Sequence, residues 1–302
     1  ILFFSFYLTI PLYSSSNMER SDRYSCYSNP DDSVKNDKKG KKDKLEDRDK
    51  TSKNKSKITF ETFDKNYARA MRFYTNQQYL SAARIFEELY PLTLGTPHAD
   101  TILFTFANCY YLNQDYELAA FHFKDYSRRY AGTPKAEEAY FLCVKSIYYL
   151  SPTHSLDQFE TKYAIEEIGY FFKQYPNSRY VEECNAMLDQ LREKLARKDF
   201  EMAKLYYYTE NYAAVQIYVK NFMKDHPASN LAPEASYLLI KSNFDFARKS
   251  VDSKQLERYL QCLDAFATLN ANYPGSPFVE QATKYAVDAE KAIEKINAKK
   301  QR

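Results

Sequence analysis

A short motif, Gly-Thr-Pro followed one residue later by Ala, occurs twice in the chain, beginning at Gly95 and at Gly132. The two copies start 37 residues apart. Thr followed by Pro is typical of a helix start, because the hydroxyl caps free N–H groups and Pro fits the first helical turn. A motif that returns at this spacing predicts an array of helix–turn–helix units.

Small and aromatic residues repeat at the same spacing. Five pairs of positions match with a shift of 37 residues: Ala70 and Ala107, Phe73 and Tyr110, Tyr79 and Tyr116, Ala82 and Ala119, Phe86 and Phe123. Small residues let two helices approach closely, and large rings fill the gaps between units. This pattern resembles the tetratricopeptide (TPR) repeat, with Ala in place of its usual Gly and without Trp.

A second marker closes each unit. It is Tyr-Pro or a close equivalent, and it occurs at Tyr90-Pro91, Tyr130, Tyr175-Pro176, His226-Pro227 and Tyr273-Pro274. Because the residue before Pro disfavours helical geometry, we expect Pro to end the second helix of each unit. From Ile58 onward we therefore predict an all-α fold, a right-handed α-solenoid of about five TPR-like helix-turn-helix units.

Glycine is scarce, with five among 302 residues, and this scarcity limits the chemistry. A phosphate-binding loop needs several glycines within a few residues, so nucleotide-binding loops of that kind are excluded. The four histidines lack helical metal-ligand spacing. The acid pairs Glu137-Glu138, Glu166-Glu167 and Glu182-Glu183 are adjacent in sequence, so on a helix their side chains point about 100° apart. We expect no enzyme activity, no catalytic residues, no metal and no cofactor.

The cysteines show no CxxC pair. Four of them, Cys109, Cys143, Cys184 and Cys262, lie in apolar helical patterns, where Cys behaves as a small core residue.

The N-terminal part divides in two. Residues 1–16 form a signal-like hydrophobic segment that is too short to span a bilayer. Residues 17–57 are polar, and Lys35 to Lys57 alone carries a net charge of +6, so we interpret this stretch as a disordered charged linker. If Met18 is the true start, the signal is absent and the protein is cytoplasmic. The remainder is slightly acidic, so we expect no nucleic acid partner.

In TPR arrays the first helix of each unit lines a concave groove. By the repeat alignment this face carries Tyr67, Met71, Tyr74, Phe104, Asn108, Tyr111, Phe141, Lys145, Tyr148, Lys204, Tyr207 and Lys241. Aromatic bodies with polar tips suit the capture of an extended peptide. The alternative is that insertions or the next unit cover these residues.

The closing segments beginning at Tyr175, His226 and Tyr273, together with Tyr67-Ala68 and the stretch from Gln78 to Phe86, resemble the BamD (ComL/YfiO) family, particularly its Bacteroidetes-like forms. The resemblance covers about residues 60–296. It implies a non-catalytic, lipid-anchored scaffold at the periplasmic face of the bacterial outer membrane, within the β-barrel assembly (Bam) complex. The alternative function is a TPR adaptor in another cell-envelope or division complex.

Matched unit to unit, the resemblance implies where partners bind. Units at about 58–176 would bind unfolded outer-membrane proteins through Tyr67, Tyr74, Phe104, Asn108 and Tyr111, to which we add Lys145 and Tyr148 of the same face. Units at about 177–302 would dock on a BamA-like barrel insertase near Lys241 and Tyr259, alongside other Bam subunits.

The resemblance departs from the family at the N-terminal anchor. In the family the lipidated Cys directly follows the hydrophobic segment, whereas a polar stretch separates Cys26 from Leu12. Lipidation of Cys26, which would add membrane association, and cleavage near Ser16 without lipidation both stay open.

Overall fold

The computed structural model describes residues 58–300. The hydrophobic segment 1–16, the charged segment 17–57 and Cys26 lie outside the described residues, so the expectations for them stay predictions.

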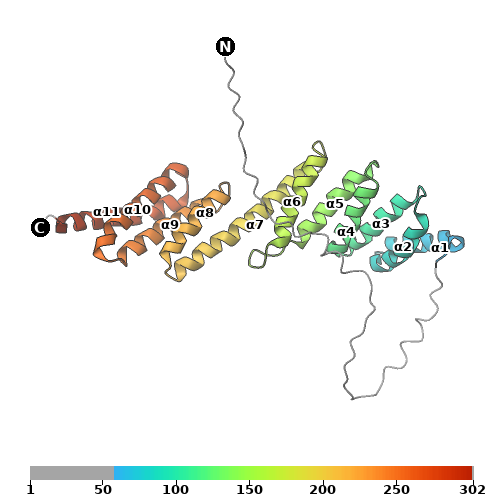
Figure 1. Ribbon diagram of the computed structural model, residues 1–302, viewed down its shortest axis with the longest axis horizontal. Helices are drawn as coiled ribbons and strands as arrows, with labels where there is room; N and C mark the ends of the chain where they lie inside the picture. The colour runs from blue at the N-terminus through green and yellow to red at the C-terminus, as the bar shows by residue number, and fades with distance from the viewer. Residues whose placement is uncertain (1–57, 301–302) are drawn as a thin grey trace, which may run out of the picture. The chain divides into compact units, whose positions relative to one another are not determined.

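The described residues form helices joined by short connections (Figure 1). The eleven α-helices are α1 Phe63–Thr75, α2 Tyr79–Thr93, α3 Ala99–Leu112, α4 Tyr116–Arg129, α5 Lys135–Leu150, α6 Phe159–Gln174, α7 Val181–Tyr208, α8 Tyr212–Asp225, α9 Ala232–Arg248, α10 Asp252–Asn272 and α11 Pro277–Lys300. A 3₁₀ turn, Phe60–Thr62, precedes α1. Among these described helices, none is both long enough and apolar enough to cross a bilayer.

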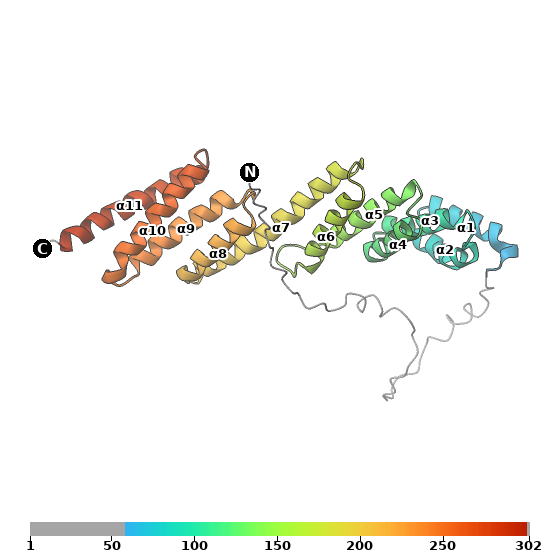
Figure 2. The ribbon, with the colours of Figure 1, turned by 45° about the horizontal axis from the view of Figure 1, so that its top comes forward.

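Consecutive helices pack against one another in chain order, from α1 on α2 to α10 on α11 (Figures 1 and 2). Helices two positions apart in the chain also touch at this end of the array, since α7 contacts α9 and α9 contacts α11. The array thus consists of five helix pairs, α1–α2 to α9–α10, followed by α11. The expected class, an all-α array of TPR-like helix-turn-helix units, is confirmed.

Three of the turns inside pairs use a left-handed residue that is not glycine. Gln77, Gln114 and Glu210 have φ of 60°, 64° and 58°. In the first turn the N–H of Gln78 donates to the carbonyl of Phe73 at 2.9 Å, and the other two turns repeat this bond at the same distance. Such a bond across six residues satisfies a free carbonyl at the helix end. These turns therefore adopt the left-handed backbone conformation without the glycine that usually occupies this position.

The expected closing residues end four of the second helices. Each adopts φ between −115° and −136° directly after the last helical residue: Tyr130, Tyr175, His226 and Tyr273. A serine follows three residues after the last three of these, and its Oγ accepts a backbone N–H at the start of the next helix. Those acceptors are Ser178 at 3.0 Å, Ser229 at 3.1 Å and Ser276 at 3.3 Å.

The first pair departs from this rule. Pro91 was expected to end the second helix, but it lies inside α2, which continues to Thr93. Pro removes only its own hydrogen bond here, close to the helix end, where carbonyls are already free. Thr93 is 3% exposed, and its hydroxyl donates to the carbonyl of Tyr90 at 2.8 Å, which holds the last turn in place.

The long helix α7 joins two separately packed cores. One cluster of buried residues runs from Ala70 to Leu191, and the next begins at Ala196. A third cluster unites α9, α10 and α11 around Ile240 and Cys262. The functional division at about residue 176 stays a prediction, while the change in packing falls inside α7.

The four cysteines of the described part lie in these cores as expected. Cys109, Cys143, Cys184 and Cys262 are 0% exposed. Burial raises the pKa of each thiol to about 12, so they remain protonated and act as small apolar side chains.

Candidate functional site

Side chains on the first helices contact each other from one pair to the next, and we call this series the first-helix ladder. Its first step joins α1 to α3, where the Nδ2 of Asn108 donates to the Tyr74 hydroxyl at 2.7 Å. The Tyr74 ring also meets Tyr79 edge-on, with centroids 5.8 Å apart. Burial raises the pKa of Tyr74, so its hydroxyl stays neutral and keeps a proton to donate.

The second step joins α3 to α5 through rings. Tyr111 lies 6.5 Å from Tyr149, and Tyr116 lies 4.7 Å from the same ring, measured between centroids. Burial is also the main cause that raises the pKa of Tyr111, so this phenol too is neutral. The step presents aromatic surface whose tips can still exchange hydrogen bonds.

The third step joins α5 to α7 and adds charge. Lys145 forms an ion pair with Glu183 at 2.7 Å, and this hydrogen bond raises the pKa of the lysine. The Tyr148 hydroxyl donates to the side-chain carbonyl of Gln190. These contacts bind the third pair to the N-terminal half of the long helix.

The fourth step joins α7 to α9. The hydroxyl of Tyr207 donates to Oδ2 of Asp245 at 2.7 Å, and the Lys241 ammonium lies 4.8 Å from the Tyr207 ring centroid. Lys204 of the same helix pairs instead with Glu201 on its own turn.

The structure leaves the predicted substrate residues half-buried, with part of each side chain reachable from solvent. They are Tyr67, Tyr74, Phe104, Asn108, Tyr111, Lys145 and Tyr148. Phe141 is different, because it is 4% exposed and stacks on Tyr180 with centroids 4.1 Å apart. For Phe141 the next unit does cover the side chain, which was the alternative interpretation of this face.

The docking prediction needs one correction. Tyr259 is 7% exposed, and its ring packs edge-on against Phe244 in the third core cluster. Its side chain therefore supports α9 and α10 from within and does not offer a contact surface. Lys241 is half-buried over the Tyr207 ring, and its role in docking stays a prediction.

The sequence placed Asn108 on the first-helix face but did not indicate Glu183, Gln190 or Asp245 as partners on the next first helix. Asn108, Glu183, Gln190 and Asp245 lie 34, 38, 42 and 38 residues after the side chains they contact. These separations are close to the 37-residue repeat, so a search for polar pairs at one repeat length would have found them.

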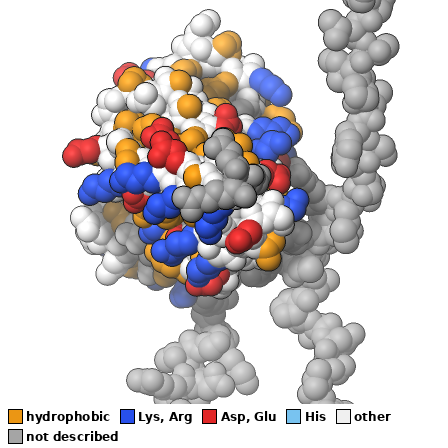
Figure 3. All heavy atoms as spheres, turned by 90° about the vertical axis from the view of Figure 1, so that its left-hand side faces the viewer, with side chains coloured by type: hydrophobic (Ala, Val, Ile, Leu, Met, Phe, Trp, Pro, Cys, Tyr) orange, Lys and Arg blue, Asp and Glu red, His pale blue; other side chains and the backbone are white. Residues whose placement is uncertain are grey.

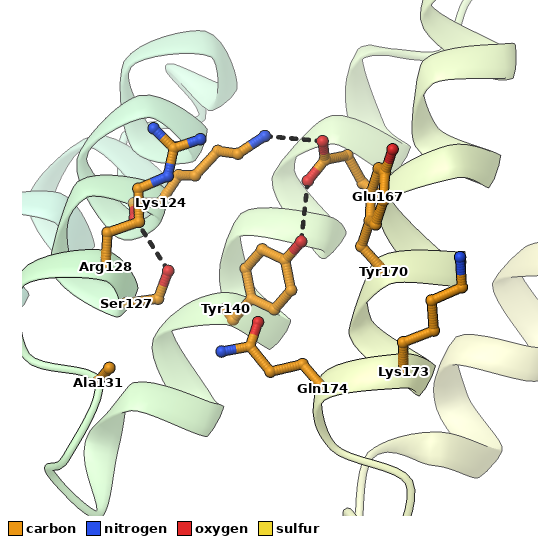
Figure 4. A pocket seen from close by; sticks show the side chains of 9 residues that line it. All are labelled: Lys124, Ser127, Arg128, Ala131, Tyr140, Glu167, Tyr170, Lys173 and Gln174. Atoms are coloured by element: carbon orange, nitrogen blue, oxygen red, sulfur yellow. Dashed lines mark hydrogen bonds and ion pairs between the residues drawn. The ribbon is translucent and has the colours of Figure 1, made fainter.

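A buried ion pair was also missed. Glu167, which the sequence marked only as one of two adjacent acids on a helix, is 3% exposed and accepts from Lys124 at 2.7 Å (Figure 4). It lies beside a hollow of about 560 Å³. Within residues 58–300, no group of three or more His, Cys, Asp or Glu side chains is placed to hold a metal ion.

Known proteins provide a comparison for this arrangement. A comparison with solved structures matches the TPR2AB domain–pHSP90 complex of yeast Sti1 and the P58(IPK) TPR domain. The first is 14% identical with a TM-score of 0.37, covering 77% of this chain and 100% of that chain. The second is 12% identical with a TM-score of 0.37, covering 77% of this chain and 66% of that chain.

Sequence families give the more specific result. No curated protein matches the chain at a significant level. The family model described as "YfiO: Outer membrane lipoprotein" matches residues 61–216 and 201–299. Since these two ranges together span most of the sequence, the chain belongs to the YfiO family of outer membrane lipoproteins.

Proposed function

We propose that this protein is a non-catalytic scaffold of outer-membrane β-barrel assembly, acting at the periplasmic face of the outer membrane. It would bind unfolded outer-membrane proteins through the first three pairs and dock on a BamA-like insertase of the Bam complex through the later ones. Membership of the YfiO family supports the setting. The first-helix ladder is the observation that carries the proposed mechanism.

The ladder suits an extended peptide that carries aromatic side chains. On α1 and α3 it offers rings whose hydroxyls remain neutral, next to the amide of Asn108. Rings provide apolar contact at low entropic cost, and the hydroxyl and amide groups can bond to a peptide backbone. At the α5 end the ammonium of Lys145 is paired with Glu183, so a terminal carboxylate of the peptide would share or replace Glu183 as its partner.

The later pairs provide the proposed docking surface. A second hollow of about 410 Å³ is lined by Tyr237, Phe244, Gln281, Lys284, Tyr285 and Asp288 of α9 and α11. The face at the C-terminal end of the array mixes Lys and Arg with Asp, Glu and hydrophobic side chains (Figure 3). Aromatic residues within a surface of mixed charge fit a folded protein partner.

Peptide binding is tested with Tyr74→Ala combined with Tyr111→Ala. Because the chain has no Trp, the emission of a Trp placed in the peptide is free of background from the protein. We expect the double variant to bind an aromatic-ended peptide at least about tenfold more weakly, since two aromatic anchors are lost. Unchanged affinity would refute this part of the proposal.

The matched control replaces another half-buried tyrosine pair, Tyr206 and Tyr218, whose rings lie 4.6 Å apart in the second core. Tyr206→Ala with Tyr218→Ala should leave peptide affinity within about twofold. If the control variant lost as much peptide affinity, the effect would come from destabilisation of the whole array and not from the loss of a binding surface.

Docking is tested by pull-down with the periplasmic part of a BamA protein. Lys284→Glu with Tyr285→Ala should reduce its recovery, whereas the Tyr74/Tyr111 double variant should keep it. If wild-type protein recovers division or peptidoglycan proteins and no BamA, an adaptor role in another envelope complex replaces this proposal.

A further inference from the structure

The hollow of about 560 Å³ lies on the second helices of pairs two and three, away from the first-helix ladder. Helices α4 and α6 form its walls, and Tyr140 of α5 reaches its floor (Figure 4). Its lining consists of Lys124, Ser127, Arg128, Ala131, Tyr140, Glu167, Tyr170, Lys173 and Gln174. No residue of the ladder belongs to this lining, so the hollow is a separate feature.

The floor of the hollow is electrically balanced. Both oxygens of Glu167 are engaged, Oε1 by Lys124 at 2.7 Å and Oε2 by the hydroxyl of Tyr140 at 3.1 Å. Burial alone would lower the pKa of Lys124, but its bonds to Glu167 and Tyr163 outweigh burial and raise the pKa. The floor therefore holds an ion pair whose two charges compensate each other.

The ammonium of Lys124 keeps a donor to spare. It has three N–H groups. Two of them are used by Glu167 and by the Tyr163 hydroxyl at 3.0 Å. Among residues 58–300 the third has no protein partner, and the Lys124 side chain lines the hollow at 24% exposed.

The rim adds two cations from opposite walls. Arg128 of α4 and Lys173 of α6 are both exposed, and within the described part of the chain neither forms an ion pair. The Lys173 ammonium lies 5.5 Å from the centroid of the Tyr170 ring. With the floor neutral, Arg128 and Lys173 leave the hollow with an excess of positive charge.

We propose that this hollow binds a phosphate group, held between Arg128 and Lys173 with one oxygen facing Lys124. A phosphate offers three strong acceptor oxygens in a tetrahedral arrangement, one for each cation. A carboxylate has two oxygens in one plane and would leave one of the three unmatched. The volume lies within the range of small-ligand sites, and the Tyr170 ring provides an apolar wall for the group esterified to the phosphate.

Phosphate of this kind has two sources, a lipid headgroup and a free phosphate compound. The test uses the full chain in two assays: calorimetric titration with inorganic phosphate, and sedimentation with phosphatidylcholine vesicles with or without phosphatidic acid, whose phosphate is a monoester with three terminal oxygens. Arg128→Gln with Lys173→Gln removes the rim cations. Arg129→Gln with Lys162→Gln is the matched control, because it removes the same charge from the same two helices outside the lining.

We expect saturable binding by wild-type protein and by the control, weakened about tenfold or more in the Arg128/Lys173 variant, because two charge-assisted hydrogen bonds are lost. Binding in the titration alone identifies a free phosphate compound. Vesicle binding that depends on phosphatidic acid and is competed by phosphate identifies a headgroup. Equal weakening in both variants, or no saturable binding in either assay, overturns the proposal. None of these outcomes depends on peptide or BamA binding.

Discussion

The side-chain amide of Asn108 donates a 2.7 Å hydrogen bond to the hydroxyl of Tyr74, and this bond connects the first helices of pairs one and two. The two residues are 34 positions apart, and both are half-buried. The bond holds the Tyr74 ring in one position on the proposed peptide-binding face. Binding and stability are therefore linked at this position, and variants here need a stability measurement beside any affinity.

The contribution of this hydrogen bond to stability can be measured by a double-mutant cycle. Asn108→Ala should lower the free energy of unfolding by about 1 kcal/mol, because the Tyr74 hydroxyl then loses its partner at a half-buried position. Once Tyr74→Phe has removed that hydroxyl, Asn108→Ala should have a smaller effect. Urea unfolding of the four proteins gives a coupling energy of about 0.5–1.5 kcal/mol. Strict additivity would show that the bond contributes nothing in solution.

The ion pair of Lys124 and Glu167 should matter more than any surface pair. Glu167→Gln leaves the ammonium of Lys124 without its counter-charge at a site 24% exposed, so we expect a loss of about 2–3 kcal/mol in unfolding free energy. Asp125→Asn breaks the pair of Asp125 and Arg129, whose side chains are 27% and 55% exposed, and should lose less than about 1 kcal/mol. Equal losses of unfolding free energy in the two variants would contradict the burial of the Lys124–Glu167 pair.

His122 should make the protein sensitive to mild acid. The centroid of its ring lies 4.5 Å from that of Phe106 and 5.5 Å from that of Tyr110. Burial lowers the pKa of His122 from 6.5 to about 4, although the nearby Asp125 acts in the opposite direction. The unfolded chain therefore takes up this proton first. Stability is fully present above pH 6.5 and falls as the pH drops toward 4, by at most about 3 kcal/mol.

The measurement is urea unfolding at a series of pH values for wild type and His122→Gln. The variant should lack the part of the acid destabilisation that lies between pH 6.5 and 4. His98→Gln serves as the control, because it removes a histidine whose side chain is exposed. Parallel profiles for wild type and His122→Gln would show that the histidine is not buried in solution.

The fold followed from the sequence because its information is local and repeated. Gly95 and Gly132 mark joints between pairs, and Tyr175, His226 and Tyr273 end helices as expected. The prediction at Pro91 was wrong because the packing of Leu89 and the hydroxyl of Thr93 hold a helix end that local preference would have broken.

The site was predicted less completely, because it depends on contacts between units. Periodicity placed Tyr74 and Asn108 on one face of the first helices, and the structure joins these two by a hydrogen bond, while the roles of the predicted site residues stay predictions. Burial of a particular side chain depends on what the next pair places over it. Tyr259 and Glu167 illustrate this, since both sit in helical patterns that do not distinguish an inner position from an outer one.

Two equivalent serines should respond differently to the same substitution. Ser146 and Ser242 end similar segments of α5 and α9, and both are 0% exposed. The Ser146 hydroxyl donates to the carbonyl of Leu142 at 2.7 Å, whereas Ser242 Oγ has no partner in the described part of the chain. Ser242→Ala should raise the unfolding free energy by up to about 1 kcal/mol, and Ser146→Ala should lower it or leave it unchanged. Thermal unfolding of both variants measures this difference. If Ser242→Ala were less stable than Ser146→Ala, the Ser242 hydroxyl would have a hydrogen-bond partner in solution.

Substitutions at two glycines test how backbone conformation affects the stability of the array. Gly169 lies inside α6, and a Cβ built there meets no atom within 4 Å. Gly169→Ala should therefore raise the unfolding free energy by about 0.5–1 kcal/mol, because Ala loses less conformational freedom in a helix. Gly95 has equal space around it but a φ of +84°, so Gly95→Ala should destabilise by about 1–2 kcal/mol. Neither site is crowded, so denaturant unfolding of the two variants compares helix preference at Gly169 with left-handed strain at Gly95. If the unfolding free energy changed in the same direction in both variants, this explanation would be wrong.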